Sequence, residues 1–109
     1  MKIKRGHIWW INLDPAVGSE IRKRRPCVVL SDDRVNEHRR TPIVVPLSHT
    51  GIVAEPITVP VPSAGPGAVA VIDQLRAVDK RRFVDCAGTL ADAELKAVAL
   101  AVKRILVLP

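Results

Sequence analysis

The sequence predicts a single, mainly β domain over residues 1–109 that ends in one α-helix. Short runs of β-branched residues recur along the chain, and Pro, Gly, Asp and Ser separate them, which is typical of a small antiparallel β domain. Helical periodicity is strong only near the C-terminus. The chain has 109 residues, of which 48% are hydrophobic, so it has the size of one domain with its own core.

Five runs are predicted strands. The first, Ile8–Leu13, ends at the turn-forming pair Asp14-Pro15. The other four are also bounded by turn residues, and they are Cys27–Leu30, Ile43–Leu47, Ile57–Val61 and Ala68–Ile72. Proline cannot donate a hydrogen bond to a neighbouring strand, so prolines within or beside these runs predict several short or edge strands. These prolines are Pro46, Pro60 and Pro62.

Two segments between the strands are predicted loops, the charged segment 32–40 and the small-residue segment 63–67. The first is a candidate lid. The C-terminal helix is predicted from a capping signal at Thr89–Asp92 and from apolar residues at spacings of three and four, namely Leu95, Val98, Val102 and Ile105. This apolar stripe is expected to pack on the sheet, with Asp92, Lys96 and Lys103 outside.

The charge is uneven. The net charge is +6 and the pI about 10.0, and residues 1–40 hold ten Lys and Arg against five Asp and Glu. This basic field favours an acidic partner, which can be a nucleic acid, an anionic membrane surface or an acidic protein. The chain has no apolar run of 18 residues and no signal-peptide core, so a cytoplasmic location with reduced thiols is expected. Cys27 and Cys86 are then predicted to be small buried residues.

The most informative segment is the loop Gly18–Pro26, which contains four consecutive cations, Arg22-Lys23-Arg24-Arg25, just before an apolar strand. Ser48 closes another predicted strand. An arginine fork beside a hydroxyl can hold phosphate oxygens without a metal, so this pairing is a candidate phosphate site. From spacing alone, a solvated charged hairpin and a serine that caps a turn are the favoured interpretation.

Other chemistry-bearing residues give weaker signals. Any of the three histidines, His7, His38 and His49, could act in proton transfer, but none is expected to be essential. The carboxylate pair Asp32-Asp33 is better explained by a turn than by a magnesium site. Neighbours in a strand face opposite sides, so one of Trp9 and Trp10 is expected in the core and the other on the surface or in a dimer contact, in preference to base stacking.

Several motifs, in order along almost the whole chain, resemble the MazF/PemK toxins of bacterial toxin–antitoxin systems. They are Arg5-Gly6-x-Ile8-Trp9, Leu13-Asp14-Pro15-x-Val17-Gly18-Ser19-Glu20, Arg25-Pro26-x-Val28-Val29-Leu30-Ser31-x-Asp33, Val45-Pro46-Leu47-Ser48 and Val71–Arg81. The resemblance implies an SH3-like antiparallel β-barrel with a C-terminal helix, of the MazF/CcdB toxin type. It further implies a homodimer that cleaves single-stranded RNA, including mRNA, at short sequences without metal or cofactor. A cognate antitoxin, expected to be acidic, would block the site, and no membrane partner is implied.

The resemblance also implies roles for individual residues. Arg25 would be the principal catalytic residue, and Ser48 stands where the family usually has threonine. Ser19 and Glu20 would fix the nucleotide beside the cut, and Gln74 would read a base edge. The other three cations of the loop, Arg22, Lys23 and Arg24, would attract RNA electrostatically.

Two positions depart from the family pattern. His7 stands where aspartate is common, and Ile21 stands where glutamine is common, so sequence preference or activity could differ. Two alternatives stay open at this point. One is a CcdB-like toxin that poisons gyrase, and the other is a basic barrel that binds nucleic acid without cutting it, which would retain RNA in a salt-dependent manner.

Overall fold

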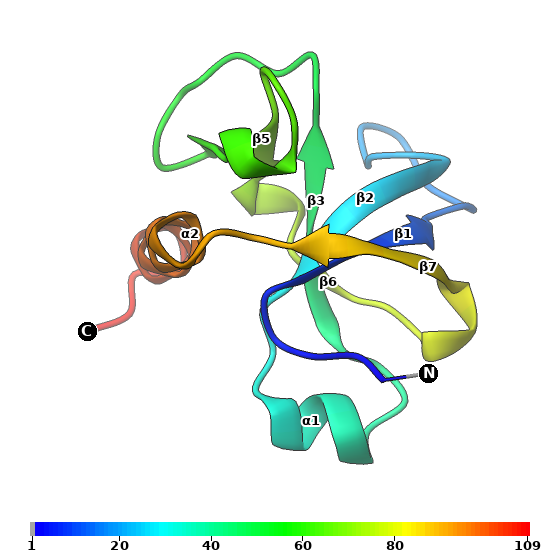
Figure 1. Cartoon of the computed structure of the whole chain (residues 1–109). Coiled ribbons are helices and arrows are strands. Elements are labelled where there is room, and N and C mark those ends of the chain that lie inside the picture. Colours follow the sequence, from blue (N-terminus) through cyan, green and yellow to red (C-terminus); the bar gives the residue numbers. More distant parts are fainter. Residues whose placement is uncertain (1) are drawn as a thin grey trace.

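The computed structural model describes residues 2–109 and contains one bent antiparallel sheet and a C-terminal helix, as predicted (Figure 1). The strands are β1 (His7–Asn12), β2 (Arg24–Val29), β3 (Ile43–Ser48), β4 (Thr58–Pro60), β5 (Val69–Val71), β6 (Arg76–Ala77) and β7 (Phe83–Thr89). Their order is β4-β5-β3-β2-β1-β7, and β6 pairs with β3. Among the described residues β4 and β7 do not pair, so the barrel-like sheet stays open.

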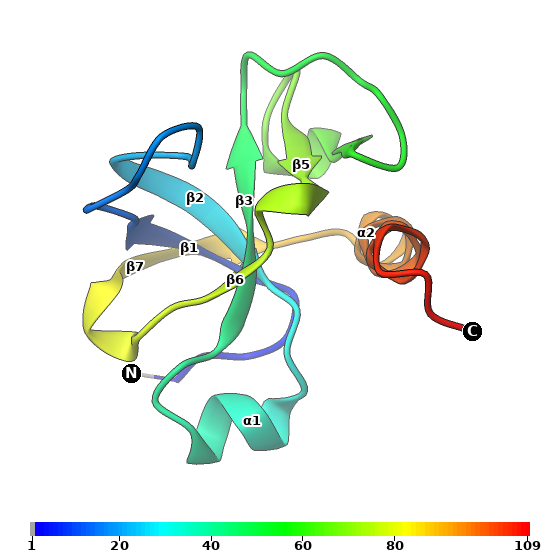
Figure 2. The same cartoon turned by 180° about the vertical axis from the view of Figure 1, so that it is seen from behind.

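The helical elements are α1 (Asp33–His38), α2 (Asp92–Ile105) and three short 3₁₀ turns, η1 (Pro62–Ala64), η2 (Ile72–Gln74) and η3 (Lys80–Arg82). Seen from both sides, α2 lies at one edge of the molecule, and α1 lies at the end opposite the β3–β4 connection (Figures 1 and 2). Within residues 2–109, no helix is long and apolar enough to cross a membrane.

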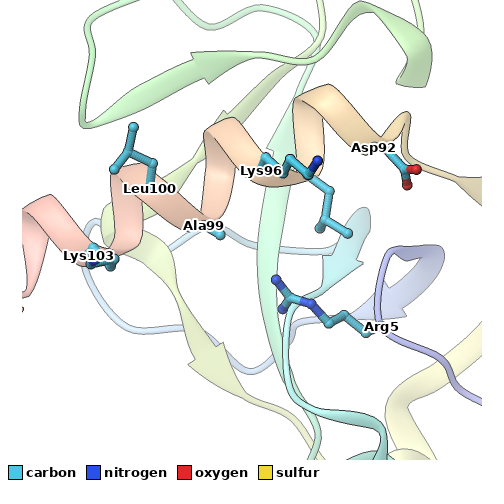
Figure 3. A pocket seen from close by; sticks show the side chains of 7 residues that line it. Arg5, Asp92, Lys96, Ala99, Leu100 and Lys103 are labelled. Carbon is cyan, nitrogen blue, oxygen red and sulfur yellow. The ribbon is translucent and has the colours of Figure 1, made fainter.

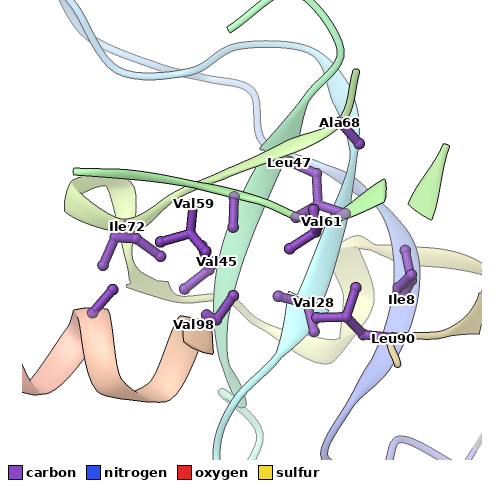
Figure 4. Packing of buried hydrophobic residues seen from close by; sticks show 12 residues of the cluster. Ile8, Val28, Val45, Leu47, Val59, Val61, Ala68, Ile72, Leu90 and Val98 are labelled. Carbon is purple, nitrogen blue, oxygen red and sulfur yellow. The ribbon is translucent and has the colours of Figure 1, made fainter. Parts of the chain in front are cut away.

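The central strands β1, β2 and β3 are covered on both faces, because neighbouring residues point into two different hydrophobic clusters. Ile8, Val28 and Val45 belong to the cluster under α2, which also contains Val98 of that helix (Figure 4). The second cluster lies on the other face and includes Trp9, whose ring meets Phe83 edge-on at 5.7 Å. The sequences of these strands are therefore continuous apolar runs, without the alternation of apolar and polar residues found in a strand that has one face in water.

The C-terminal helix follows the predicted stripe, since Val98 is fully buried and Leu95, Val102 and Ile105 pack against the same cluster. The predicted capping signal is wrong. Ala91 occupies the N-cap position without a side-chain cap, and its N–H donates to Ser63 Oγ at 3.1 Å. A tertiary hydrogen bond from η1 thus replaces the local cap.

The predicted loop and lid at residues 32–40 is wrong, because this segment forms α1. Asp32 caps α1 by accepting from Arg34 N, and the buried Asn36 donates to the carbonyl of Ser31 at 2.9 Å. A helix of six residues is too short for periodicity to reveal. Cys27 is buried as predicted, but Cys86 is exposed, against the prediction. Cys86 lies on β7, and the sequence prediction missed both β6 and β7.

Two prolines, Pro26 and Pro46, lie inside central strands, and for Pro46 this differs from the expected short or edge strand. Pro26 pairs across to Trp10, and Pro46 pairs across to Cys27. Each is tolerated because the strand has a partner on only one side at that point: β2 meets β3 from Cys27 onward, and β3 changes its other partner from β6 to β5 around Pro46.

Candidate phosphate-binding site

The loop between β1 and β2 is fixed by its own hydrogen bonds. Leu13 N donates to the Lys23 carbonyl at 2.8 Å, and Lys23 N donates to Asp14 Oδ1 at 3.0 Å. Lys23 adopts φ +68°, a left-handed conformation that non-glycine residues seldom take. Glu20 Oε1 accepts from Val17 N at 2.6 Å. The basic loop is therefore a structured turn that presents its cations from set positions.

Arg25 and Ser48 face the same side of the sheet. Strands β2 and β3 pair from Cys27 and Pro46 onward, so Arg25 and Ser48 each lie two residues outside the first pair. Because side chains alternate along a strand, both point to the face occupied by Cys27 and Pro46. Arg25 is half-buried and donates from Nε to the Arg22 carbonyl at 3.2 Å. This bond steers the guanidinium and leaves its two terminal nitrogens for a ligand.

A cavity of about 300 Å³ lies between the loop and the end of β3. It is lined by Glu20, Ile21, Arg22, Lys23, Arg25, Leu47 and Ser48. A second cavity of about 210 Å³ shares Glu20 and Ile21 with it and is otherwise lined by Leu13, Pro46, Asp73, Gln74, Leu75 and Arg76. The two cavities adjoin at Glu20 and Ile21, and we call them together the loop groove.

Gln74 anchors the loop over this groove. Its Oε1 accepts from Ile21 N at 3.3 Å, so the carbonyl end of the amide is occupied and the NH₂ end remains a donor. Arg76 donates from a terminal nitrogen to the Leu13 carbonyl at 3.4 Å, which ties η2 and β6 to the end of β1. Sequence reasoning missed that Asp73 and Arg76 line the groove, because only the 3₁₀ turn η2 brings them there.

The groove is electropositive. Burial raises the pKa of the Cys27 thiol to about 12, and the charges of Arg76 and Arg25 oppose that rise. Both guanidinium groups therefore lie close to this buried residue, on the face that carries Ser48. The thiol stays protonated at neutral pH, so Cys27 is a packing residue and not a nucleophile.

Two predicted site residues lie outside the loop groove. Ser19 is exposed in the loop and does not line either cavity. Arg24 pairs with Asn12 and, one residue before Arg25, projects to the opposite face. The structure therefore brings together six of the eight predicted residues: Glu20, Arg22, Lys23, Arg25, Ser48 and Gln74.

The histidines stand apart from this groove. His7 Nδ1 accepts from Lys4 N at 3.2 Å, His38 ends α1, and His49 Nε2 lies 3.4 Å from the Ala64 carbonyl. Over residues 2–109 no three His, Cys, Asp or Glu side chains gather as a metal site would require. A larger cavity, about 490 Å³, lies between α2 and Arg5, away from this chemistry (Figure 3).

A bent antiparallel sheet with a C-terminal helix and a cationic hairpin groove defines a small basic protein with a candidate phosphate site. Its family follows from comparison: the chain belongs to the family described as PemK-like, MazF-like toxin of type II toxin-antitoxin system, whose model matches residues 4–106.

Individual relatives agree with this assignment. The chain is 33% identical to Endoribonuclease MazF9 of Mycobacterium tuberculosis over 110 residues, which cover 93% of each chain. Its fold matches the crystal structure of MazF from Deinococcus radiodurans with a TM-score of 0.87 at 25% identity, covering 99% of both chains. It also matches an endoribonuclease in complex with its cognate antitoxin from a mycobacterial species, with a TM-score of 0.79 at 21% identity, covering 97% of this chain and 96% of that one.

Proposed function

We propose that this protein is a sequence-specific endoribonuclease toxin that cleaves single-stranded RNA, mRNA included, without a metal or other cofactor. Relatives that carry the name endoribonuclease support the activity. The single observation that carries the proposal is that Arg25, at the start of β2, and Ser48, at the end of β3, line the same cavity of the loop groove. Residues 1–109 act as one domain in this account.

In the proposed reaction the RNA supplies its own nucleophile. The 2′-oxygen attacks the adjacent phosphorus and loses its proton, while the bond from phosphorus to the 5′-oxygen breaks and that oxygen gains a proton. The products are a 2′,3′-cyclic phosphate and a 5′-hydroxyl. The protein has to align these atoms and stabilise the charge that gathers on the phosphorane.

Arg25 is proposed to hold the two non-bridging phosphate oxygens with its terminal nitrogens, because its Nε is occupied by the Arg22 carbonyl. The charge of Arg25 neutralises the phosphorane, and the residue assists proton transfer. Ser48 donates a hydrogen bond to the same phosphate. Arg22 and Lys23 add positive charge at the groove, which attracts the RNA backbone.

Base recognition is proposed to lie along the rest of the loop groove. Gln74 keeps its NH₂ group free to donate to a base edge while its carbonyl oxygen holds the loop. Ser19 and Glu20 flank the nucleotide next to the cut. Since Glu20 Oε1 already accepts from Val17 N, its contribution to RNA binding runs mainly through loop shape. Arg24 is proposed to contact RNA from the opposite face.

The proposed partners are a second copy of the chain and a cognate antitoxin. Large apolar side chains are exposed in the β3–β4 connection and after α2, and a second copy would cover them; they are Ile52, Val53, Ile57, Leu106, Val107 and Leu108. The net charge of +6 favours an acidic antitoxin segment that folds on the basic surface. The proposed compartment is the cytoplasm, where mRNA is found.

The test is cleavage of a long single-stranded RNA in EDTA, with the fragment ends identified by mass spectrometry. We expect fragments that end in cyclic phosphate, and we expect Arg25→Ala to reduce the rate at least about 10²-fold, the usual cost of one charge-stabilising group. Arg39→Ala is the matched control, because it removes the same charge from the exposed end of α1. Equal rates for Arg25→Ala and Arg39→Ala would refute the proposed role of Arg25.

A further inference from the structure

A third cavity, of about 240 Å³, opens on the opposite face of the same strands. It is lined by Ile8, Trp10, Pro26, His49, Ser63, Ala64, Ala87, Gly88 and Thr89. We call it the tryptophan pocket.

Two lining residues directly follow the catalytic candidates in the chain. Pro26 comes after Arg25, and His49 comes after Ser48. Alternation along the strand turns Arg25 into the loop groove and Pro26 into the tryptophan pocket. The loop groove and the tryptophan pocket therefore lie on opposite faces of the sheet, where β2 begins and β3 ends, and only the sheet backbone separates them.

Trp10 supplies an aromatic surface that the core does not use. It is 40% exposed, whereas its neighbour Trp9 is 7% exposed and packs against Phe83. An exposed tryptophan in a cavity, next to a cationic strand, is the arrangement that single-strand binding proteins use to stack bases. Arg24 lies two residues before Pro26 and on the same face, about 7 Å along the strand. There its guanidinium can meet the phosphate of a nucleotide whose base is held at Trp10.

The far wall of the tryptophan pocket is held in place. Ser63 N and Oγ both donate to the Glu94 carboxylate, and Ser63 Oγ accepts from Ala91 N, so η1 is tied to the start of α2. The His49 ring lies against the turn that follows η1, since a Cβ on Gly65 would approach His49 Nε2 to 2.9 Å. The pocket is thus bounded by the sheet on one side and by an anchored turn on the other.

We propose that the tryptophan pocket binds one unpaired nucleobase of the RNA, stacked on Trp10, in a nucleotide next to the one cleaved in the loop groove. This inference rests on the proposed function, because it places the RNA around the end of β3. Between base stacking and a dimer contact, the anchored cavity and the nearby Arg24 favour the base. The pocket would help to select the cleavage sequence through shape and stacking.

The test uses ten-nucleotide 2′-O-methyl RNA homopolymers, one for each base, which bind without offering the 2′-hydroxyl nucleophile. We expect saturable quenching of the tryptophan fluorescence by at least one homopolymer, and Trp10→Ala should weaken its binding about 5- to 150-fold. Trp10→Phe keeps an aromatic ring and should stay within about threefold of wild type. Ile43→Ala is the control, because Ile43 is 39% exposed on β3 and lines none of these cavities.

Three results would overturn this inference. They are unchanged affinity in Trp10→Ala, affinity in Trp10→Phe as low as in Trp10→Ala, and a shift from dimer to monomer in Trp10→Ala measured by sedimentation without RNA. The proposed nuclease fails separately. If the wild-type protein leaves RNA intact in EDTA but Trp10-dependent quenching persists, the base pocket stands and the catalytic assignment of Arg25 falls.

Discussion

Gln74 connects the fold to the loop that carries the cations, and replacing it tests this link. Its Oε1 accepts the Ile21 amide hydrogen across the loop groove. A neutral hydrogen bond contributes about 0.5–1.5 kcal/mol. At 3.3 Å this bond is longer than the usual 2.7–3.2 Å, so we expect the lower half of that range, about 0.5–1 kcal/mol.

This free energy corresponds to about a two- to fivefold increase in loop opening, since a factor of ten corresponds to 1.4 kcal/mol. Gln74→Ala should therefore speed hydrogen exchange of the Ile21 amide by about two- to fivefold, as measured by NMR. RNA cleavage should also fall, because Gln74→Ala removes the NH₂ donor that is proposed to meet a base edge. The remaining amides of β1 and β2 should keep their exchange rates.

Gln74→Glu is the matched variant. It keeps the acceptor and should preserve the protection of Ile21, but it replaces the NH₂ donor with a negative charge in the groove. In Gln74→Glu we therefore expect RNA cleavage to fall while the Ile21 amide keeps its protection from hydrogen exchange. Unchanged Ile21 exchange in Gln74→Ala would refute the anchoring role of Gln74.

Three further predictions concern other parts of the molecule. Hydrogen bonds from Arg34 lower the pKa of Asp32 from 3.8 to about 2, so its cap on α1 should be complete above pH 3.8 and lost as the pH falls towards 2. Circular dichroism should show this acid loss in wild type and not in Asp32→Asn. In native protein at pH 7.5 a thiol reagent should modify Cys86 alone, because Cys27 is buried with its pKa raised to about 12; mass spectrometry showing two labels would contradict this. Ser48→Thr should keep RNA cleavage within about threefold, whereas Ser48→Ala should lower it by about 10²-fold, as measured by initial rates.

The strands with strong local signals were predictable from the sequence. Ile8–Leu13 and Ile43–Leu47 closely match β1 and β3, because β-branched runs ended by turn residues carry their own information. Strand β7 was missed because all but its first residue are exposed and it contains Gly88, so it lacks a hydrophobic pattern. Its pairing with β1 is a tertiary property that local propensity cannot supply.

The candidate site was predictable to a similar degree. Four consecutive cations before an apolar strand made a phosphate site a candidate, although spacing alone favoured a solvated hairpin. Resemblance to the family then selected Arg25 and Ser48. The sequence could not show that these two share one face, because that depends on the register between β2 and β3. Nor could it show that Arg24 turns away from Arg25, since the prediction started β2 at Cys27 and the strand begins at Arg24.

The most direct test of the central claim is to sequence the 5′ ends that the protein produces from a mixed RNA pool in EDTA, with wild type and Arg25→Ala side by side. We expect 5′-hydroxyl ends at one short shared sequence for wild type and a loss of those ends of at least about 10²-fold for Arg25→Ala. Intact RNA with wild type, or the same ends at the same rate with Arg25→Ala, would contradict it.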